Sequence, residues 1–247
     1  MGLFDMPGPL FNWLDGQLAA IASPAARLVV WGAVAGVVSM LLYRALSPQA
    51  RIAIGKTELL QTRRTLNSYD GGLDGAWPLM RRMLRAAFRQ VGRVGWPALL
   101  ASLPLVCLLA WLSTSYGYTY PEPGVVPRIT TAPENIEAHW VDERVDAGDP
   151  QSRPPRVLVA DQGADAVVDV SLPNPVPVIH KRQWWNTLLG NPVGYLPSDA
   201  TVELVRVELP RKEYLATGPQ WMRGWEALFF GVLLAMSLGL KRWANIQ

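Results

Sequence analysis

Two long apolar runs with a basic segment between them constrain this chain more than any other feature of its sequence. The runs cover residues 25–46 and 96–117. Each has the roughly 20 residues that a helix needs to cross the hydrocarbon core of a bilayer. Residues 44–96 hold ten Lys or Arg but only three acids, Glu58, Asp70 and Asp74. We therefore predict two transmembrane helices joined by a cationic segment.

A third apolar run lies near the C-terminus, within residues 221–243. Its centre reads WEALFFGVLLAMSLGL, and it is followed directly by Lys241 and Arg242. Tryptophan is enriched where a helix leaves the hydrocarbon, and Trp221, Trp225 and Trp243 mark both ends of this run. We predict a third transmembrane helix with a short tail.

The first 24 residues predict a short helix on the membrane surface. One helical face gathers its apolar side chains: Leu10, Trp13, Leu14, Leu18 and Ile21. Such a face lies in the bilayer interface or packs against the protein's own transmembrane helices. The sequence is compatible with both.

The basic segment predicts a helical hairpin over residues 47–95. Ser47 and Pro48 indicate the start of a first helix, and the glycines of SYDGGLDG indicate a turn after residue 67. In the second helix an apolar seam recurs every three or four residues: Trp77, Met80, Leu84, Ala87, Val91 and Val94. We expect this seam to pack against Ile52, Leu59 and Leu66 of the first helix.

Five arginines occupy the remaining faces of the second helix: Arg81, Arg82, Arg85, Arg89 and Arg93. Cationic helices beside a membrane usually meet anionic lipid. They also bind the phosphates of RNA, which makes a ribosome the less favoured partner. We predict that these arginines contact lipid or a client protein, and we predict no binding to DNA.

Residues 118–220 predict a β-rich domain. Frequent prolines exclude long helices, and five segments show the apolar alternation of strands: VVPRITT, IEAHWV, RVLVA, AVVDVSL and TVELVRVEL. A β-sandwich-like domain of about a hundred residues fits this pattern. A loop-rich insertion before the last strand carries Trp184 and Trp185, which we predict to contact a partner.

The complete fold prediction is an α-helical membrane protein with three transmembrane helices, a cytoplasmic helical hairpin and an extracytoplasmic β-sandwich-like domain. Lys and Arg collect in cytoplasmic loops. This rule places residues 47–95 and the C-terminal tail in the cytoplasm, and the N-terminus and residues 118–220 outside. The expected location is a bacterial inner membrane.

Neither an enzyme nor a cofactor is expected. The two histidines, His139 and His180, lack a nucleophilic partner in any known catalytic spacing, and Cys107 is the one cysteine. Asp161, Asp165 and Asp169 recur every four residues, but the glycine and the final glutamate of a calcium loop are missing. A solvated strand edge explains these acids better than a metal site does.

The order of these segments resembles the three-span branch of the YidC/Oxa insertase superfamily. The segments that carry the resemblance are LLYRALSPQARI, LMRRMLRAAFRQVGRVGWPALLASLPL and the final apolar run. The resemblance implies a membrane protein insertase or assembly factor whose partners are membrane lipid and client membrane proteins. It also implies a polar groove in the membrane, with candidate lining residues Ser39, Tyr43, Arg44, Ser102, Ser113 and Ser237.

The chain departs from that family in two respects. Bacterial insertases of this superfamily carry a positive charge within the membrane, whereas Arg27 and Arg44 lie near the ends of the first apolar run. Their large external domain also lies at a different place in the chain. Two alternatives therefore stay open: a non-catalytic scaffold subunit of a larger membrane complex that docks a partner through the β domain, and a transmembrane sensor.

Overall fold

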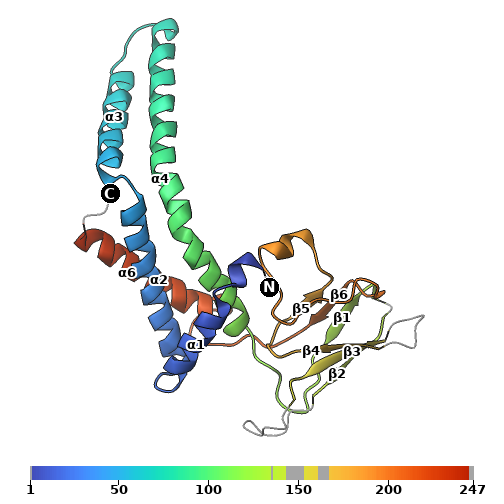
Figure 1. Cartoon of the computed structure of the whole chain (residues 1–247). Coiled ribbons are helices and arrows are strands. Elements are labelled where there is room, and N and C mark those ends of the chain that lie inside the picture. Colours follow the sequence, from blue (N-terminus) through green and yellow to red (C-terminus); the bar gives the residue numbers. More distant parts are fainter. Residues whose placement is uncertain (1, 135, 143–152, 161–166, 245–247) are drawn as a thin grey trace. The chain divides into compact units, whose positions relative to one another are not determined.

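The computed structural model describes residues 2–134, 136–142, 153–160 and 167–244, and they form a mostly helical protein with two small sheets (Figure 1). The chain divides into two compact units. The first unit contains Met1–Arg27 and Val106–Leu228, and the second contains Leu28–Leu105 and Phe229–Gln247. Asp161 and Asp165 of the acidic repeat lie outside the described residues.

Four helices account for most of the described helical residues: α2 (Pro24–Leu46), α3 (Gln49–Asn67), α4 (Leu73–Ser115) and α6 (Trp225–Trp243). Shorter helical segments are η1 (Leu3–Asp5), α1 (Gly8–Ala19), η2 (Trp184–Thr187) and α5 (Gln220–Arg223). The first predicted helix of the hairpin corresponds to α3, and the predicted turn lies between α3 and α4. The second hairpin helix and the second apolar run are one continuous helix, α4, which contains Pro78, Pro97 and Pro104.

By length and composition, two helices of the described chain can cross a membrane, namely α2 and α4. Helix α6 coincides with the third apolar run and has 19 residues. Glu226 lies at its start and Lys241 and Arg242 at its end, so its uncharged part is the 14 residues from 227 to 240. At 1.5 Å per residue this part is about 21 Å long, shorter than the roughly 30 Å hydrocarbon core.

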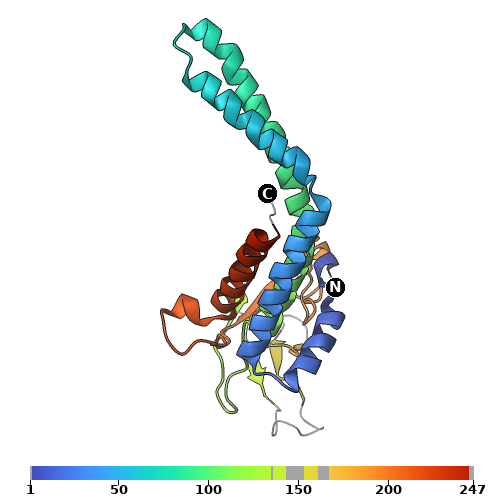
Figure 2. The same cartoon turned by 90° about the vertical axis from the view of Figure 1, so that its left-hand side faces the viewer.

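Helices α2 and α6 pack closely within the second unit, and both views show them side by side (Figures 1 and 2). A Cβ atom added at Gly32 would lie 2.9 Å from the carbonyl oxygen of Phe229, and one added at Gly36 would lie 3.0 Å from that of Leu233. The two glycines are four residues apart and therefore share one face of α2. The small-residue face of the first apolar run is thus a helix-packing face.

Two antiparallel sheets of three strands lie in the first unit. One has the order β1 (Ile129–Ala132), β6 (Leu204–Val207), β5 (Val178–His180), and the other β2 (Ala138–Val141), β3 (Arg156–Ala160), β4 (Val167–Ser171). A strand lies in each of the five predicted segments, and β5 lies in the insertion that was predicted as loop. Val157 and Val159 of β3 and Val205 and Val207 of β6 alternate with more exposed residues and are fully buried. Buried residues of both sheets form one apolar core.

Candidate functional site

The hairpin formed by α3 and the first part of α4 lies within the second unit (Figure 2). The inner face of α3 follows helical spacing. Ile52, Gly55 and Thr62 are buried, and Leu59 and Leu66 are half-buried on the same side. Ile52, Leu59 and Leu66 thus share the less exposed side of α3, which agrees with the predicted spacing.

The predicted seam of the second arm was wrong. Four of its six residues, Trp77, Met80, Leu84 and Val91, are exposed, and Val91 is 66% exposed. The less exposed side of α4 instead contains residues one position earlier. Ala86 is buried, and five others are half-buried: Ala76, Leu79, Met83, Gln90 and Arg93. A shift of one residue turns a helix by about 100°. The most apolar face of this arm therefore points away from α3.

Polar contacts to the backbone of α3 explain this rotation of α4. Gln90 Nε2 donates a hydrogen bond to the carbonyl oxygen of Ile52 at 3.2 Å, and Arg93 donates to that of Arg51 at 3.5 Å. Gly55 makes room for both side chains, because a Cβ at that position would lie 2.1 Å from Gln90 Oε1. Apolar periodicity in the sequence predicts which residues lie inside, but it does not reveal such polar contacts.

The outward face of α4 carries an apolar stripe consisting of Trp77, Met80, Leu84, Phe88 and Val91. Phe88, which sequence reasoning missed, is 74% exposed. Helical spacing places these five residues along one side of the helix. The structure thus presents a continuous apolar surface on the hairpin, which we call the hairpin stripe.

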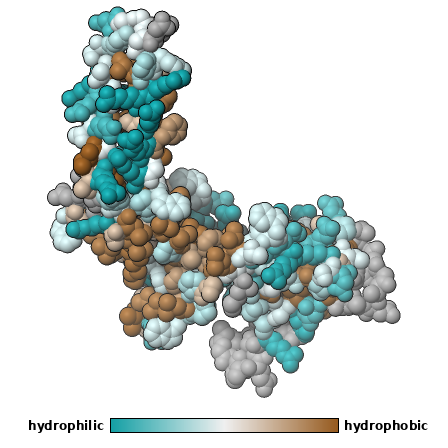
Figure 3. All heavy atoms as spheres, turned by 45° about the horizontal axis from the view of Figure 1, so that its top comes forward, coloured by the Kyte–Doolittle hydropathy of each residue, from teal (hydrophilic) through white to brown (hydrophobic). Residues whose placement is uncertain are grey.

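Arginines surround the hairpin stripe. Arg81, Arg82, Arg85 and Arg89 are exposed, whereas Arg93 is half-buried against α3. The guanidinium of Arg81 lies 5.1 Å from the centre of the Trp77 ring, and Arg89 lies 3.8 Å from Glu58 of α3. A cavity of about 430 Å³ is lined by these four exposed arginines together with Glu58, Trp77, Pro78 and Ala86. Figure 3 shows hydrophilic side chains covering much of the hairpin, with apolar side chains between them.

The predicted groove residues lie on three helices. Ser39, Tyr43 and Arg44 are on α2, and Ser237 on α6 lies against Gly36 of α2. On α4, Ser102 donates a hydrogen bond to the carbonyl oxygen of Leu99, and Ser113 donates to that of Ala110, both at 2.8 Å. These two hydroxyls are thus bonded within their own helix. The groove itself stays a prediction.

The tryptophan pair of the insertion forms the start of η2. Trp184 is 81% exposed, whereas Trp185 is 40% exposed and lies 5.0 Å from the ring of His180. His180 is also near the ring of Tyr195, and its Nδ1 is 2.6 Å from the carbonyl oxygen of Lys181. His180 therefore belongs to an aromatic cluster that holds the insertion on β5, and Trp184 is left at the surface.

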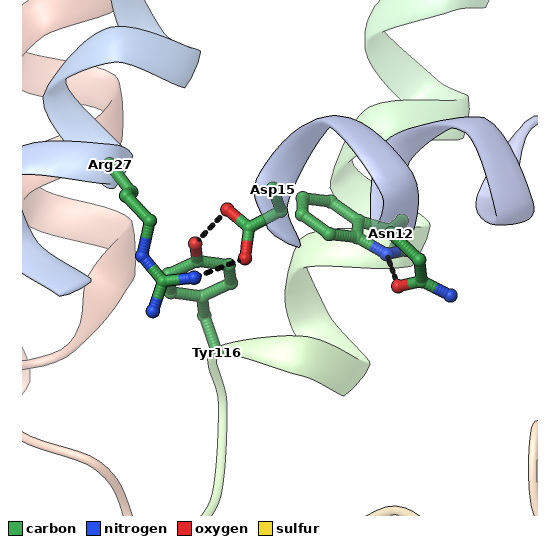
Figure 4. Close-up of polar contacts among 5 residues, drawn as sticks. Asn12, Asp15, Arg27 and Tyr116 are labelled. Carbon is green, nitrogen blue, oxygen red and sulfur yellow. Dashed lines mark hydrogen bonds and ion pairs between the residues drawn. The ribbon is translucent and has the colours of Figure 1, made fainter. Parts of the chain in front are cut away.

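A half-buried ionic cluster in the first unit was missed by sequence reasoning (Figure 4). The Asp15 carboxylate of α1 pairs with Arg27 and accepts a hydrogen bond from the Tyr116 hydroxyl. Arg27 also lies over the Tyr116 ring, 5.6 Å from its centre. Beside this cluster, Asn12 accepts a hydrogen bond from the Trp111 indole at 2.7 Å. These contacts fasten α1 to the start of α2 and to the end of α4.

The cluster extends toward the segment that precedes α5. The Tyr214 hydroxyl donates a hydrogen bond to the carbonyl oxygen of Tyr116 at 3.0 Å, and Lys212 lies over the Tyr214 ring. Burial raises the pKa of the Tyr214 hydroxyl. Burial and the nearby Arg27 lower the pKa of Lys212. Asp15 and Arg27 are distant in the sequence from Tyr116 and Tyr214, so no local motif marked this cluster.

Comparisons with known proteins identify no relative of this chain. No protein-family model, curated protein or solved structure matches the chain.

Proposed function

We propose that this protein is a membrane protein insertase or assembly factor that helps hydrophobic segments enter the bilayer. The observation that carries this proposal is the hairpin stripe, an exposed row of large apolar side chains on a helix continuous with an apolar, membrane-length helix. A stable soluble surface rarely exposes such a row unless it binds something. A hydrophobic client segment fits it.

The surrounding arginines suit the same role. Arg81, Arg85 and Arg89 place positive charge beside the hairpin stripe, where anionic lipid headgroups attract it. The hairpin would then stay near the bilayer while the stripe contacts the client. A surface of this kind acts through burial and charge, without a cofactor or a catalytic group.

The proposal includes three membrane spans, α2, the apolar part of α4, and α6. The short uncharged part of α6 suits a thinned bilayer, because a span shorter than the hydrocarbon core draws the two surfaces together. The proposed location is a bacterial inner membrane, with the hairpin and the C-terminus in the cytoplasm and the sheets outside. Ser39, Tyr43, Arg44, Ser102, Ser113 and Ser237 are the proposed lining of a hydrated groove, in keeping with the resemblance to YidC/Oxa insertases.

Site-specific photocrosslinking in cells tests the proposal. A crosslinker at Phe88 should form adducts with several newly made membrane proteins, because this side chain is exposed on the hairpin stripe. A crosslinker at Gln61, an exposed polar position of α3, is the matched control. Adducts at Phe88 but not at Gln61 support the proposal. Absence of adducts at Phe88, or equal yields at both positions, contradicts it.

The exposed Trp184 favours a second candidate function, a scaffold subunit that docks a partner through the β domain. Purification of the full chain in a mild detergent separates the two. One stoichiometric companion that is lost from a Trp184→Ser variant indicates a scaffold subunit. Varied, substoichiometric companions that are lost from a Phe88→Ser variant indicate an insertase.

A further inference from the structure

A second apolar surface lies in the first unit, at the N-terminus and around η2. Its exposed side chains are Met6, Leu10 and Trp13 from the N-terminal segment, and Trp184, Leu188 and Leu189 from the insertion. We call these six residues the outer patch. Neither the hairpin stripe nor the predicted groove includes any of them.

Backbone contacts bring the two halves of the outer patch together, although they are about 180 residues apart. The amide of Phe4 donates a hydrogen bond to the carbonyl oxygen of Leu188 at 2.9 Å. Asp5 Oδ2 accepts hydrogen bonds from the amides of Gly2 at 2.8 Å and Gly190 at 2.6 Å. Figure 1 shows the N-terminal segment and η2 beside each other.

The outer patch is almost without charge. Residues 183–197 contain no Asp, Glu, Lys or Arg, and residues 1–14 contain only Asp5, although Lys181 and the exposed Arg182 directly precede the insertion's tryptophans. The Asp5 carboxylate is bonded to two backbone amides, so its charge is compensated within the protein. The apolar side chains of the outer patch thus outnumber the charges beside it, and an amphipathic environment fits it better than a strongly charged partner does.

The position of α1 identifies that environment. Asp15 fastens α1 to Arg27 near the start of α2, and Asn12 fastens it to Trp111 near the end of α4. Phe11 also packs on Trp111, with 5.6 Å between ring centres. The outer patch therefore lies beside the start of α2 and the end of α4. In a membrane protein this is the level of the headgroups, where tryptophan rings gather.

We propose that the outer patch inserts into the headgroup region of the phospholipid bilayer, on the side that carries the sheets. Trp13 and Trp184 would anchor it, with Leu10 and Leu188 reaching the outer acyl region. The N-terminal segment and the insertion thus form one membrane-binding surface. The inference rests on the proposed membrane embedding of α2 and α4, but it does not require insertase activity.

Environment-sensitive labels on the full chain in phosphatidylcholine nanodiscs test this assignment. Cys107→Ser removes the native cysteine, and single cysteines are then introduced as Trp13→Cys, Leu188→Cys or Glu208→Cys and labelled with NBD. Glu208 is an exposed residue of the same domain and serves as the control. Quenching by spin-labelled lipid measures contact with the bilayer, and quenching by aqueous iodide measures contact with water.

We expect blue-shifted emission and at least twofold quenching by spin-labelled lipid at positions 13 and 188, unchanged in 0.5 M salt, with neither effect at position 208. Labels at 13 and 188 that iodide quenches as strongly as the label at 208 would overturn the assignment. So would labels shielded from both quenchers, which indicate a protein partner or a second copy. If labels within α2 also fail to meet spin-labelled lipid, the membrane embedding itself is wrong. Client crosslinking at Phe88 does not affect this readout.

Discussion

The Tyr116 hydroxyl donates a hydrogen bond to the carboxylate of Asp15, which lies 101 residues earlier in the chain. The same carboxylate pairs with Arg27. Asp15 of α1 thus links the start of α2 to the residue that follows the end of α4. Because the Asp15 and Arg27 side chains are each about 15% exposed, the pair is shielded from solvent and counterions.

Asp15→Asn should loosen α1. The substitution removes the ion pair and leaves the half-buried Arg27 guanidinium without its charge partner, at a cost of about 1.5–3 kcal/mol. Hydrogen exchange of the α1 amides in nanodiscs should accelerate at least tenfold, while exchange in β3 stays unchanged. Tyr116→Phe is the control, because it removes one hydrogen bond but retains the ion pair, and it should cost about 1 kcal/mol. A variant Asp15→Asn with wild-type exchange would show that the cluster does not hold α1.

The first unit should lose stability in strong base. Burial raises the pKa of Tyr214 in the folded state above the ordinary value of 10.0. Above pH 10 the unfolded state therefore binds fewer protons than the folded state, and the free energy of unfolding falls as the pH rises. Tyr214→Phe should make this decline shallower between pH 10 and 11. Thermal melts of both proteins over this range measure the difference, and identical slopes would contradict the prediction.

Lys212, beside the same cluster, should make the free energy of unfolding rise with pH. Burial and Arg27 lower the pKa of Lys212 in the folded state, so the charged side chain destabilises the fold. This destabilisation is fully present below the lowered pKa and vanishes above the ordinary value of 10.5. Lys212→Met should therefore raise the melting temperature at neutral pH, and the gain should shrink as the pH rises toward 11. Arg211→Met, which changes the neighbouring exposed cation, is the control. An equal gain at both pH values would assign the effect to packing alone.

Gly36→Leu should separate α2 from α6. A leucine would collide with the Leu233 carbonyl and with Met236, and neither backbone nor packed side chain can move away cheaply. Overpacking of this kind costs roughly 1–3 kcal/mol or more. Disulfide crosslinking between cysteines on α2 and α6 in a Cys107→Ser background should fall several-fold. Gly231→Leu is the matched control, because a Cβ at Gly231 of α6 meets no atom within 4 Å. Equal yields from both variants would argue against this packing face.

The two faces of the hairpin should respond differently to the same polar residue. Ile52→Ser places a hydroxyl in a 4% exposed site and should destabilise the hairpin by about 2–4 kcal/mol. Phe88→Ser, at a 74% exposed site, should change stability by less than about 0.5 kcal/mol. Limited proteolysis near residue 70 reports on hairpin opening. If Phe88→Ser opened the hairpin as readily as Ile52→Ser, the hairpin stripe would be a packing surface and not a binding surface.

The hairpin shows which structural features the periodicity of a sequence can predict. The turn near Gly71 and Gly72 and the inner face of α3 followed from residue types and spacing. The rotation of α4 did not, because it depends on Gln90 and Arg93, whose hydrogen bonds reach backbone carbonyls of α3. An apolar repeat identifies an amphipathic helix, but it does not reveal what covers its apolar face.

Local sequence therefore determined the elements of this protein: the two membrane-length helices, the helical hairpin, and five of the strands. These features depend on the length of apolar runs, on turn residues and on alternation, all of which are local. Tertiary structure alone decided which distant residues meet, namely Asp15 with Tyr116, Phe4 with Leu188, and Gly36 with Leu233. Such contacts depend on how whole elements pack. The hairpin stripe and the outer patch could be identified only from the tertiary structure, because exposure depends on which faces the packing covers.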